Sequence, residues 1–313
     1  MTDNALILRN AKNITTPKVS NFQKYVFWIP TGMTATDTIL TVTGSSDTDL
    51  KGAALEAHLP GGATAKELTL LHNVSYEIDI DDATTMQVYE GVSGSNASTI
   101  HRNDDKNKLI LTRSDDFKLT GDNAKSLAET MAGSAAFLGT GLNFSTGAGL
   151  ASASAEAAAA GGFAPFAAIG GASMRHETGS HVEMKGMNLA VGFSREVTQG
   201  DNRLLFGPLV EYGRGTYDSY VNAAHGDGTV SYLGAGAFLR REQADGLFYE
   251  GSLRFGRSKM DYSADLATGS TTTHTSYDTD ANYIGAHLGI GQQVTAASGN
   301  KREIYLRYFY TRQ

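Results

Sequence analysis

The chain has 313 residues, of which 26 are basic and 33 acidic, and its formal net charge is -7. This balance argues against a nucleic-acid-binding protein, which would need a basic face. Cysteine is absent, which excludes a disulfide framework, a thiolate zinc site and a cysteine nucleophile. With 36 glycines, 14 tyrosines and 13 phenylalanines against 5 prolines, the composition indicates a mainly β protein with one large domain or two.

Residues 1–120 contain short strand-like segments separated by polar turns. A sandwich and a solenoid both fit these segments, because no motif repeats at a fixed spacing. The first residues, MTDNALILRNAKN, show no export signal, so we expect an exported protein to have further residues upstream. The predicted strands are Tyr25–Ile29, Thr38–Val42, Glu67–His72, Ser75–Ile80, Met86–Val92 and Lys108–Thr112.

A helix is predicted to start near Asp122 or Asn123, either of which can cap it. No charged residue occurs between Glu129 and Glu156, but the segment consists mostly of Ala, Gly and Ser. A membrane-spanning helix needs about 20 mainly apolar residues, so we favour a slim helix in a tight protein cavity over an Ala-rich surface helix. The predicted packing face contains Leu127, Met131, Ala135, Leu138 and Leu142.

Seven longer strands are predicted after this helix, and apolar side chains alternate with small or polar ones along them. In Met187–Ser194, for example, four apolar side chains alternate with small or polar ones. The strands are predicted at about 163–176, 183–197, 203–219, 229–242, 247–263, 277–295 and 301–313. Short turns are expected at Thr198–Asn202, Gln243–Gly246 and Ala296–Asn300, and longer polar links at 220–228 and 264–276.

This pattern of turns and strands is typical of an outer-membrane β-barrel, although a soluble barrel or lipocalin-like cup also alternates. Charged residues of these strands fall on the face opposite the apolar one, and in the membrane only the barrel interior supplies the water that they need. Inner glycines such as Gly234 and Gly285 would leave room for a helix about 10 Å across. The candidate pore-lining residues are Glu211, Glu250, Arg254, His287 and Arg307.

Several segments resemble a known family. GFAPFAAIGGASMRHETGSHVEMKGMNLAVGFSREV at 162–197, FGPLVEYGRGTYDSY at 206–220 and FYEGSLRFGRSKMDY at 248–262 resemble the translocator domain of autotransporters, the type V secretion family. AETMAGSAAFL at 128–138 resembles the linker helix of that family, and residues 21–44 are similar to the end of a passenger domain.

The resemblance implies a twelve-stranded outer-membrane barrel, a helix through its pore and a passenger at the cell surface. It divides the chain into the end of a passenger (1–120), a pore-threading linker helix (121–161) and the first part of the barrel (162–313). The implied partners are outer-membrane lipid, the chain's own passenger and the outer-membrane barrel assembly machinery, with a monomeric barrel, no cofactor and no nucleic acid. About seven of twelve strands are found, so we expect an incomplete barrel and a fragment of a larger protein. A soluble or surface β-rich adhesion or binding module is the alternative.

No catalytic motif is found, and an enzyme is not expected. GVSGS at 91–95 is not a G-x-S-x-G elbow, and HETGSH at 176–181 is not H-E-x-x-H. The acidic cluster around Asp79–Asp82 lacks the spacing of a calcium loop and is interpreted as a solvated loop. Some relatives cleave their passenger inside the pore, and by that resemblance Asn143, with Glu211 or Glu250 as activator, is a cleavage candidate, although a purely structural role for Asn143 is favoured.

Overall fold

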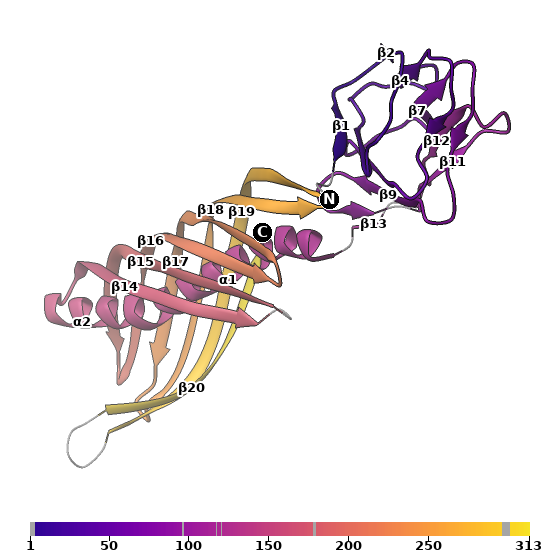
Figure 1. Ribbon diagram of the computed structural model, residues 1–313. Helices are drawn as coiled ribbons and strands as arrows, with labels where there is room; N and C mark the ends of the chain where they lie inside the picture. Colours follow the sequence, from indigo (N-terminus) through magenta and orange to yellow (C-terminus); the bar gives the residue numbers. More distant parts are fainter. Residues whose placement is uncertain (1–3, 96, 117, 120, 178–179, 296–300) are drawn as a thin grey trace. The chain divides into compact units, whose positions relative to one another are not determined.

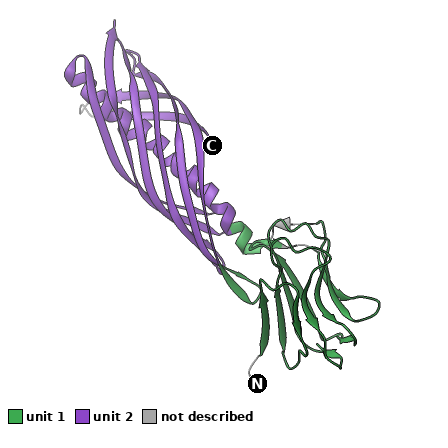
Figure 2. Ribbon diagram, turned by 90° about the horizontal axis from the view of Figure 1, so that it is seen from above, with its two compact units in different colours: residues 1–125, 266–273 green, residues 126–265, 274–313 purple. Residues whose placement is uncertain are grey.

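The computed structural model describes residues 4–95, 97–116, 118–119, 121–177, 180–295 and 301–313. The chain is mainly β and divides into two compact units, which Figure 2 distinguishes by colour. The first unit comprises residues 1–125 and 266–273, and the second comprises residues 126–265 and 274–313.

The first unit contains a parallel β-solenoid, which decides between the two arrangements that the sequence left open. Its first sheet stacks β1 (Ala5–Arg9), β3 (Lys24–Trp28), β6 (Ala54–Leu59) and β9 (Thr85–Glu90) in parallel. Its second sheet stacks β2 (Ile14–Thr16), β4 (Thr38–Val42) and β7 (Glu67–Asn73) in parallel, and β5 (Thr48–Asp49) pairs with β8 (Ile78–Asp79) at a third side. Antiparallel strands β10 (Gly94–Ser95), β11 (Thr99–Arg102), β12 (Lys108–Thr112) and β13 (Lys118–Leu119) complete the sheets.

Apolar side chains at matching positions of successive coils form the solenoid core. Phe27 pairs in register with Ala57, and both are fully buried. Two β-turns, after Pro30 and after Pro60, place Gly32 and Gly62 at φ of 80° and 76°, a region that glycine adopts without strain. The strand predicted at Ser75–Ile80 is only two residues long here, and Ala54–Leu59 is a strand that the sequence reading missed.

The second unit contains the predicted seven-stranded antiparallel sheet, with the strands in sequence order (Figure 1). The longer links expected at 220–228 and 264–276 are wrong, because the strands continue through them to tight turns after Val221 and Thr268. The turn predicted at Ala296–Asn300 lies outside the described residues. The strands are β14 (Phe163–Glu177), β15 (His181–Gln199), β16 (Asn202–Val221), β17 (Ala224–Glu242), β18 (Leu247–Thr268), β19 (Thr271–Thr295) and β20 (Lys301–Arg312).

One nearly continuous helix precedes the sheet and runs along its concave side (Figure 2). It consists of α1 (Gly121–Phe144), a π-helical segment (Ser145–Gly149) and α2 (Leu150–Ala160). Gly161, in the left-handed conformation at φ 61°, ends α2 and lets the chain turn into β14. None of the described helices combines the length and the apolar character that a membrane-spanning helix requires.

The buried face of the helix differs from the predicted one. Leu138 and Leu142 are buried, but Met131 is 66% exposed and Ala135 is exposed as well, while Leu127 is only half-buried. The buried positions follow a stripe of mostly small and polar residues: Ser126, Glu129, Thr130, Gly133, Ser134, Phe137, Leu138, Gly141, Leu142, Ser145, Thr146 and Gly149. This difference arises because the helix packs against a polar surface, where hydroxyl groups find partners and apolar side chains are not required.

Candidate functional site

The concave face of the sheet holds the helix through contacts between aromatic side chains and glycines. Phe137 of α1 is fully buried over Gly186 and Gly215 of neighbouring strands, where an added Cβ would lie 2.9 and 3.1 Å from its ring. In the opposite direction, Tyr232 of β17 reaches Gly141 of α1, where a Cβ would lie only 1.9 Å from the tyrosine hydroxyl. These contacts bring the helix backbone close to the sheet, as a slim helix in a cavity requires.

A buried ion pair lies beside the start of the π-helical segment. Arg254 on β18 and Glu211 on β16 are 1% and 3% exposed, and Arg254 Nη1 lies 2.9 Å from Glu211 Oε2. Arg254 also donates to the carbonyl oxygen of Leu142 at 3.4 Å, and Ser145 Oγ donates to Glu211 at 3.2 Å. Tyr283 Oη donates to the other carboxylate oxygen of Glu211 at 2.8 Å. The pair therefore connects the helix to three strands of the sheet.

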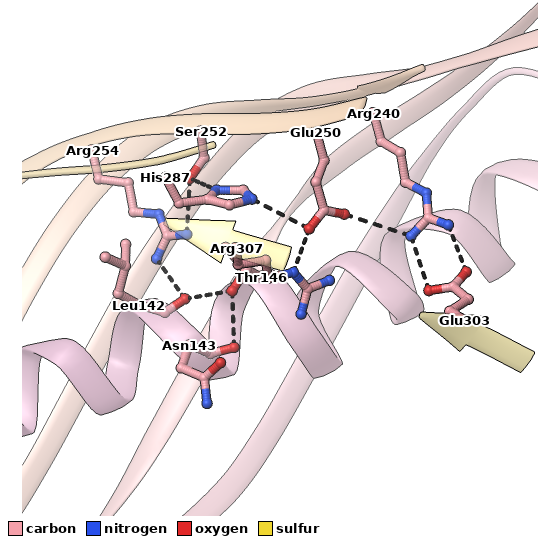
Figure 3. A network of polar contacts seen from close by, with 10 residues as sticks. All are labelled: Leu142, Asn143, Thr146, Arg240, Glu250, Ser252, Arg254, His287, Glu303 and Arg307. Carbon is pink, nitrogen blue, oxygen red and sulfur yellow. Dashed lines mark hydrogen bonds and ion pairs between the residues drawn. The ribbon is translucent and has the colours of Figure 1, made fainter. Parts of the chain in front are cut away.

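A second charged cluster continues from this pair across the sheet (Figure 3). Ser252 accepts a hydrogen bond from Arg254 at 3.0 Å and lies 2.7 Å from Nδ1 of His287, whose Nε2 lies 3.5 Å from Glu250. Arg307 Nε donates to the same Glu250 oxygen. The network continues through Arg240, whose Nη1 lies 3.6 Å from Glu250 Oε2 and whose Nη2 lies 2.5 Å from Glu303.

The structure brings the five candidate pore-lining residues together on the concave face of β16, β18, β19 and β20. Their pairing could not be read from the sequence, since it depends on strand register. Four further polar residues of this face were not predicted as pore-lining: Asn188, Tyr232, Arg240 and Tyr283. Only their positions in the alternating pattern of each strand could have indicated them. Asn143 is exposed, and its amide points away from the Glu250 cluster (Figure 3), so the structure does not pair it with an activating carboxylate.

The convex face of the sheet is apolar over part of each strand. The exposed fractions of the large apolar side chains in this part range from 40% for Met187 to 76% for Ile304. These side chains define the apolar band: Ile169, Met187, Phe193, Val210, Leu233, Leu239, Leu253, Phe255, Ile284, Leu288, Ile304 and Leu306. So large an exposed apolar surface on a sheet with a charged concave face is the pattern of a lipid-facing barrel wall.

Beyond the apolar band, the convex face of the same strands becomes polar, and this region is called the polar half. It extends toward the hairpins that join β14 to β15 and β16 to β17. Outward side chains of the polar half include Arg175, Glu183, Lys185, Thr216, Asp218, Asp227, Lys259, Asp261 and Asp280. Among the described residues, no group of three or more His, Asp or Glu side chains is arranged to hold a metal ion.

The helix begins level with the polar half and runs along the concave face toward the turns after Gln199 and Glu242. Near its start, the Ser126 hydroxyl lies 2.8 Å from that of Tyr262 and 3.2 Å from that of Ser219, which lie on the concave side of the strand segments that carry the polar half. Near its end, Ser194 Oγ donates to the carbonyl oxygen of Ala153 at 2.7 Å. A cluster of Leu150, Ala153, Ala157, Phe166, Leu205, Leu209 and Phe238 packs the end of the helix onto the sheet.

Comparison with known proteins identifies this unit. The model of the autotransporter β-domain family matches residues 166–313. Among solved structures, the β-domain of the Bordetella autotransporter BrkA is similar, with 17% identity and a TM-score of 0.42 over 48% of this chain and 58% of that one. The open form of the ferric-catecholate import receptor Fiu from E. coli K12 has 12% identity and a TM-score of 0.28 over 47% and 31% of the two chains.

The chain thus spans less than two thirds of the BrkA chain that it matches, at 58%. No curated protein sequence matches the chain. The family match covers all but the first residues of the seven-stranded sheet, including both charged clusters of its concave face. Residues 166–313 of this chain belong to the autotransporter β-domain family.

Proposed function

We propose that the sheet forms part of a translocator in the outer membrane of a bacterium, which exports the N-terminal residues of the chain and anchors them at the cell surface. The observation that carries this proposal is the helix on the concave face of a sheet whose convex face is apolar. The Arg254–Glu211 pair contacts the helix, and we propose that the apolar band faces the lipid. This role consists of transport and anchoring, and it needs no catalytic residue.

The proposed domain organisation follows the structural elements. Residues 1–120 are the C-terminal part of a passenger, residues 121–161 the linker helix, and residues 162–313 the first strands of the barrel. Because the helix starts at the polar half and leads back to the solenoid, we place the polar half on the outer side of the membrane. The turns after Gln199 and Glu242 then lie on the periplasmic side.

Closure of the barrel requires partners for the two edge strands. In the described sheet, β14 and β20 each pair with only one neighbour. An unpaired strand edge in lipid is costly, since its backbone N–H and C=O groups find no water there. We therefore propose that further strands pair with both edges to close a monomeric barrel, as would be expected for a fragment of a larger autotransporter. Insertion would use the outer-membrane barrel assembly machinery, and lipid would surround the apolar band.

Extraction from membranes distinguishes this function from a soluble or surface β-rich adhesion module. The larger autotransporter that contains this chain and the further strands is fractionated from cells, and the membrane pellet is washed with high salt and alkali before detergent is added. A translocator stays in the outer-membrane pellet until detergent releases it. A soluble or peripheral module appears in the periplasm, the medium or the alkaline wash, and that result would refute the proposal.

A further inference from the structure

Three cations occupy the border between the apolar band and the polar half on the convex face. Lys185 and Arg214 are exposed on β15 and β16, and the Lys259 side chain on β18 is 68% exposed. The strand register places Arg214 and Lys259 in one row across the sheet, with Ser231 between them: Arg214 pairs with Ser231, and Ser231 pairs with Lys259. Lys185 pairs with Thr216, two residues from Arg214 on the same face.

These three cations are poorly neutralised by the protein. Among the described residues, Lys185 and Arg214 form no ion pair, and Lys259 reaches only Asp280, at the limiting distance of 4.0 Å. The neighbouring arginines are neutralised by close ion pairs, because Arg175 lies 2.7 Å from Glu177 and Arg257 lies 2.8 Å from Asp280. Lys185 and Arg214 therefore present positive charge without an ion-pair partner among the described residues, and Lys259 is only weakly neutralised.

The surroundings of the three cations have the chemistry of a phosphate-binding surface. The outward residues Thr216 and Ser231 lie between the cations and carry hydroxyl groups that can donate to phosphate oxygens. Arg214 can donate two parallel hydrogen bonds to one phosphate, while lysines act as point charges. Directly opposite Arg214 on the other side lies Met187, a member of the apolar band, so a bound ligand would meet apolar surface beside the charges.

We propose that Lys185, Arg214 and Lys259, with Thr216 and Ser231, bind the phosphate groups of lipopolysaccharide in the outer leaflet. This inference rests on the proposed function, which places the polar half on the outer side of the membrane. Phosphates of an outer-leaflet lipid lie at the level where its acyl chains end, and the cations lie at the level where the apolar band ends. A small soluble anion would make no use of that band, so the combination selects a lipid.

Retention of lipopolysaccharide by the purified protein tests the proposal. The larger autotransporter that contains this chain and the further strands is extracted from outer membranes in mild detergent, and bound lipopolysaccharide per protein is measured by native mass spectrometry. Substitution of all three cations (K185Q, R214Q and K259Q) should lower retention by about tenfold or more. The control replaces three exposed outward arginines beyond the opposite end of the apolar band (R195Q, R241Q and R302Q), and it should retain the wild-type amount.

Three results would overturn the proposal. Equal retention by wild type and the K185Q/R214Q/K259Q variant shows that these cations do not bind the lipid, and an equal loss in the control shows a general effect of charge. Removal of the bound species by inorganic phosphate shows a site for free anions. Recovery of the wild-type chain in the outer-membrane fraction is recorded in the same preparation, so failure of the proposed function is seen separately as absence from that fraction.

Discussion

Among single residues, Arg254 links the helix to the sheet most directly, because it contacts both the Leu142 carbonyl oxygen and Glu211. It is almost completely buried, and Glu211, its one carboxylate partner among the described residues, is buried as well. A buried ion pair adds little net stability, but removal of one member leaves an uncompensated charge. The pair therefore fixes how the helix sits on the sheet rather than supplying most of the stability.

Replacement of Arg254 by leucine should destabilise the folded protein by about 3–5 kcal/mol, because Glu211 would stay buried without a partner. The double variant E211Q/R254L should recover a large part of that loss, since it removes both charges. Denaturant unfolding in detergent micelles measures both changes. An R254L protein as stable as the wild type would contradict the assigned pairing.

His58 gives the solenoid a dependence on pH. Burial lowers the pKa of His58 below its ordinary value of 6.5, and the hydrogen bond to Glu56 only partly opposes this. The neutral ring donates to Glu56 at 2.5 Å and stacks on Trp28 at a centroid distance of 4.1 Å. A depressed pKa means that the unfolded chain takes up a proton first as pH falls, so stability is complete above about pH 6.5 and declines below it.

Fluorescence of Trp28, the single tryptophan of the chain, should therefore report a lower unfolding midpoint at about pH 5.5 than at about pH 7.5. The decline should be smaller in His58→Gln, which cannot be protonated. Some decline should persist, since burial also lowers the pKa of His72. If the unfolding midpoint falls by the same amount between about pH 7.5 and about pH 5.5 in wild type and variant, His58 does not cause the pH dependence.

At the scale of elements, the helix shows where prediction from sequence stops. Its existence and range follow from caps and composition, because these are local signals. Its buried face does not, since Met131 looks suited to packing but is exposed while Ser126 and Thr130 are buried. Which face is buried depends on the partner surface, and that surface is made by strands far along the sequence, such as β15 and β16, which begin 37 and 58 residues after α1 ends.

Two glycines of α1 offer a matched test of this packing. Gly139→Ala adds a methyl group in open space and should stabilise the helix by about 1 kcal/mol. Gly141→Ala makes the same change where the new Cβ would meet the Tyr232 hydroxyl, so it should instead loosen the helix. The rate at which a protease cleaves the helix in detergent is measured for both variants. Equal rates would contradict the close contact of α1 with β17.

Strands were predicted unevenly, for physical reasons. The long strands of the sheet show clean alternation because one face meets apolar surroundings and the other a polar interior. The central solenoid strand Ala54–Leu59 was missed because Ala, Glu and His are weak strand formers. Ala57 fits there because the side chain of Phe27 fills the core of the neighbouring coil. This packing depends on a residue of another coil, so the local sequence gives no sign of it.

At the scale of the whole molecule, the sequence predicted the family, since the motifs at 162–262 lie largely within the matched region. It also predicted which charges share the concave face, because alternation determines the face of each strand residue. The pairs themselves, such as Arg254 with Glu211, needed the register of three strands. The links at 220–228 and 264–276 were predicted too long, because the strand ends beyond the apolar band are polar, and a polar segment resembles a loop in the sequence.

The most direct test of the account is the sidedness of single cysteines, which the cysteine-free chain permits. Cysteine is introduced at Lys51 in the solenoid, at Ala223 in the β16–β17 turn or at Asp201 in the β15–β16 turn, and intact cells are treated with a membrane-impermeant maleimide. If the sheet crosses the outer membrane, Lys51→Cys and Ala223→Cys should be labelled on intact cells, and Asp201→Cys only after the outer membrane is permeabilised. Labelling of Asp201→Cys as fast as the other two on intact cells would contradict a sheet that crosses the membrane.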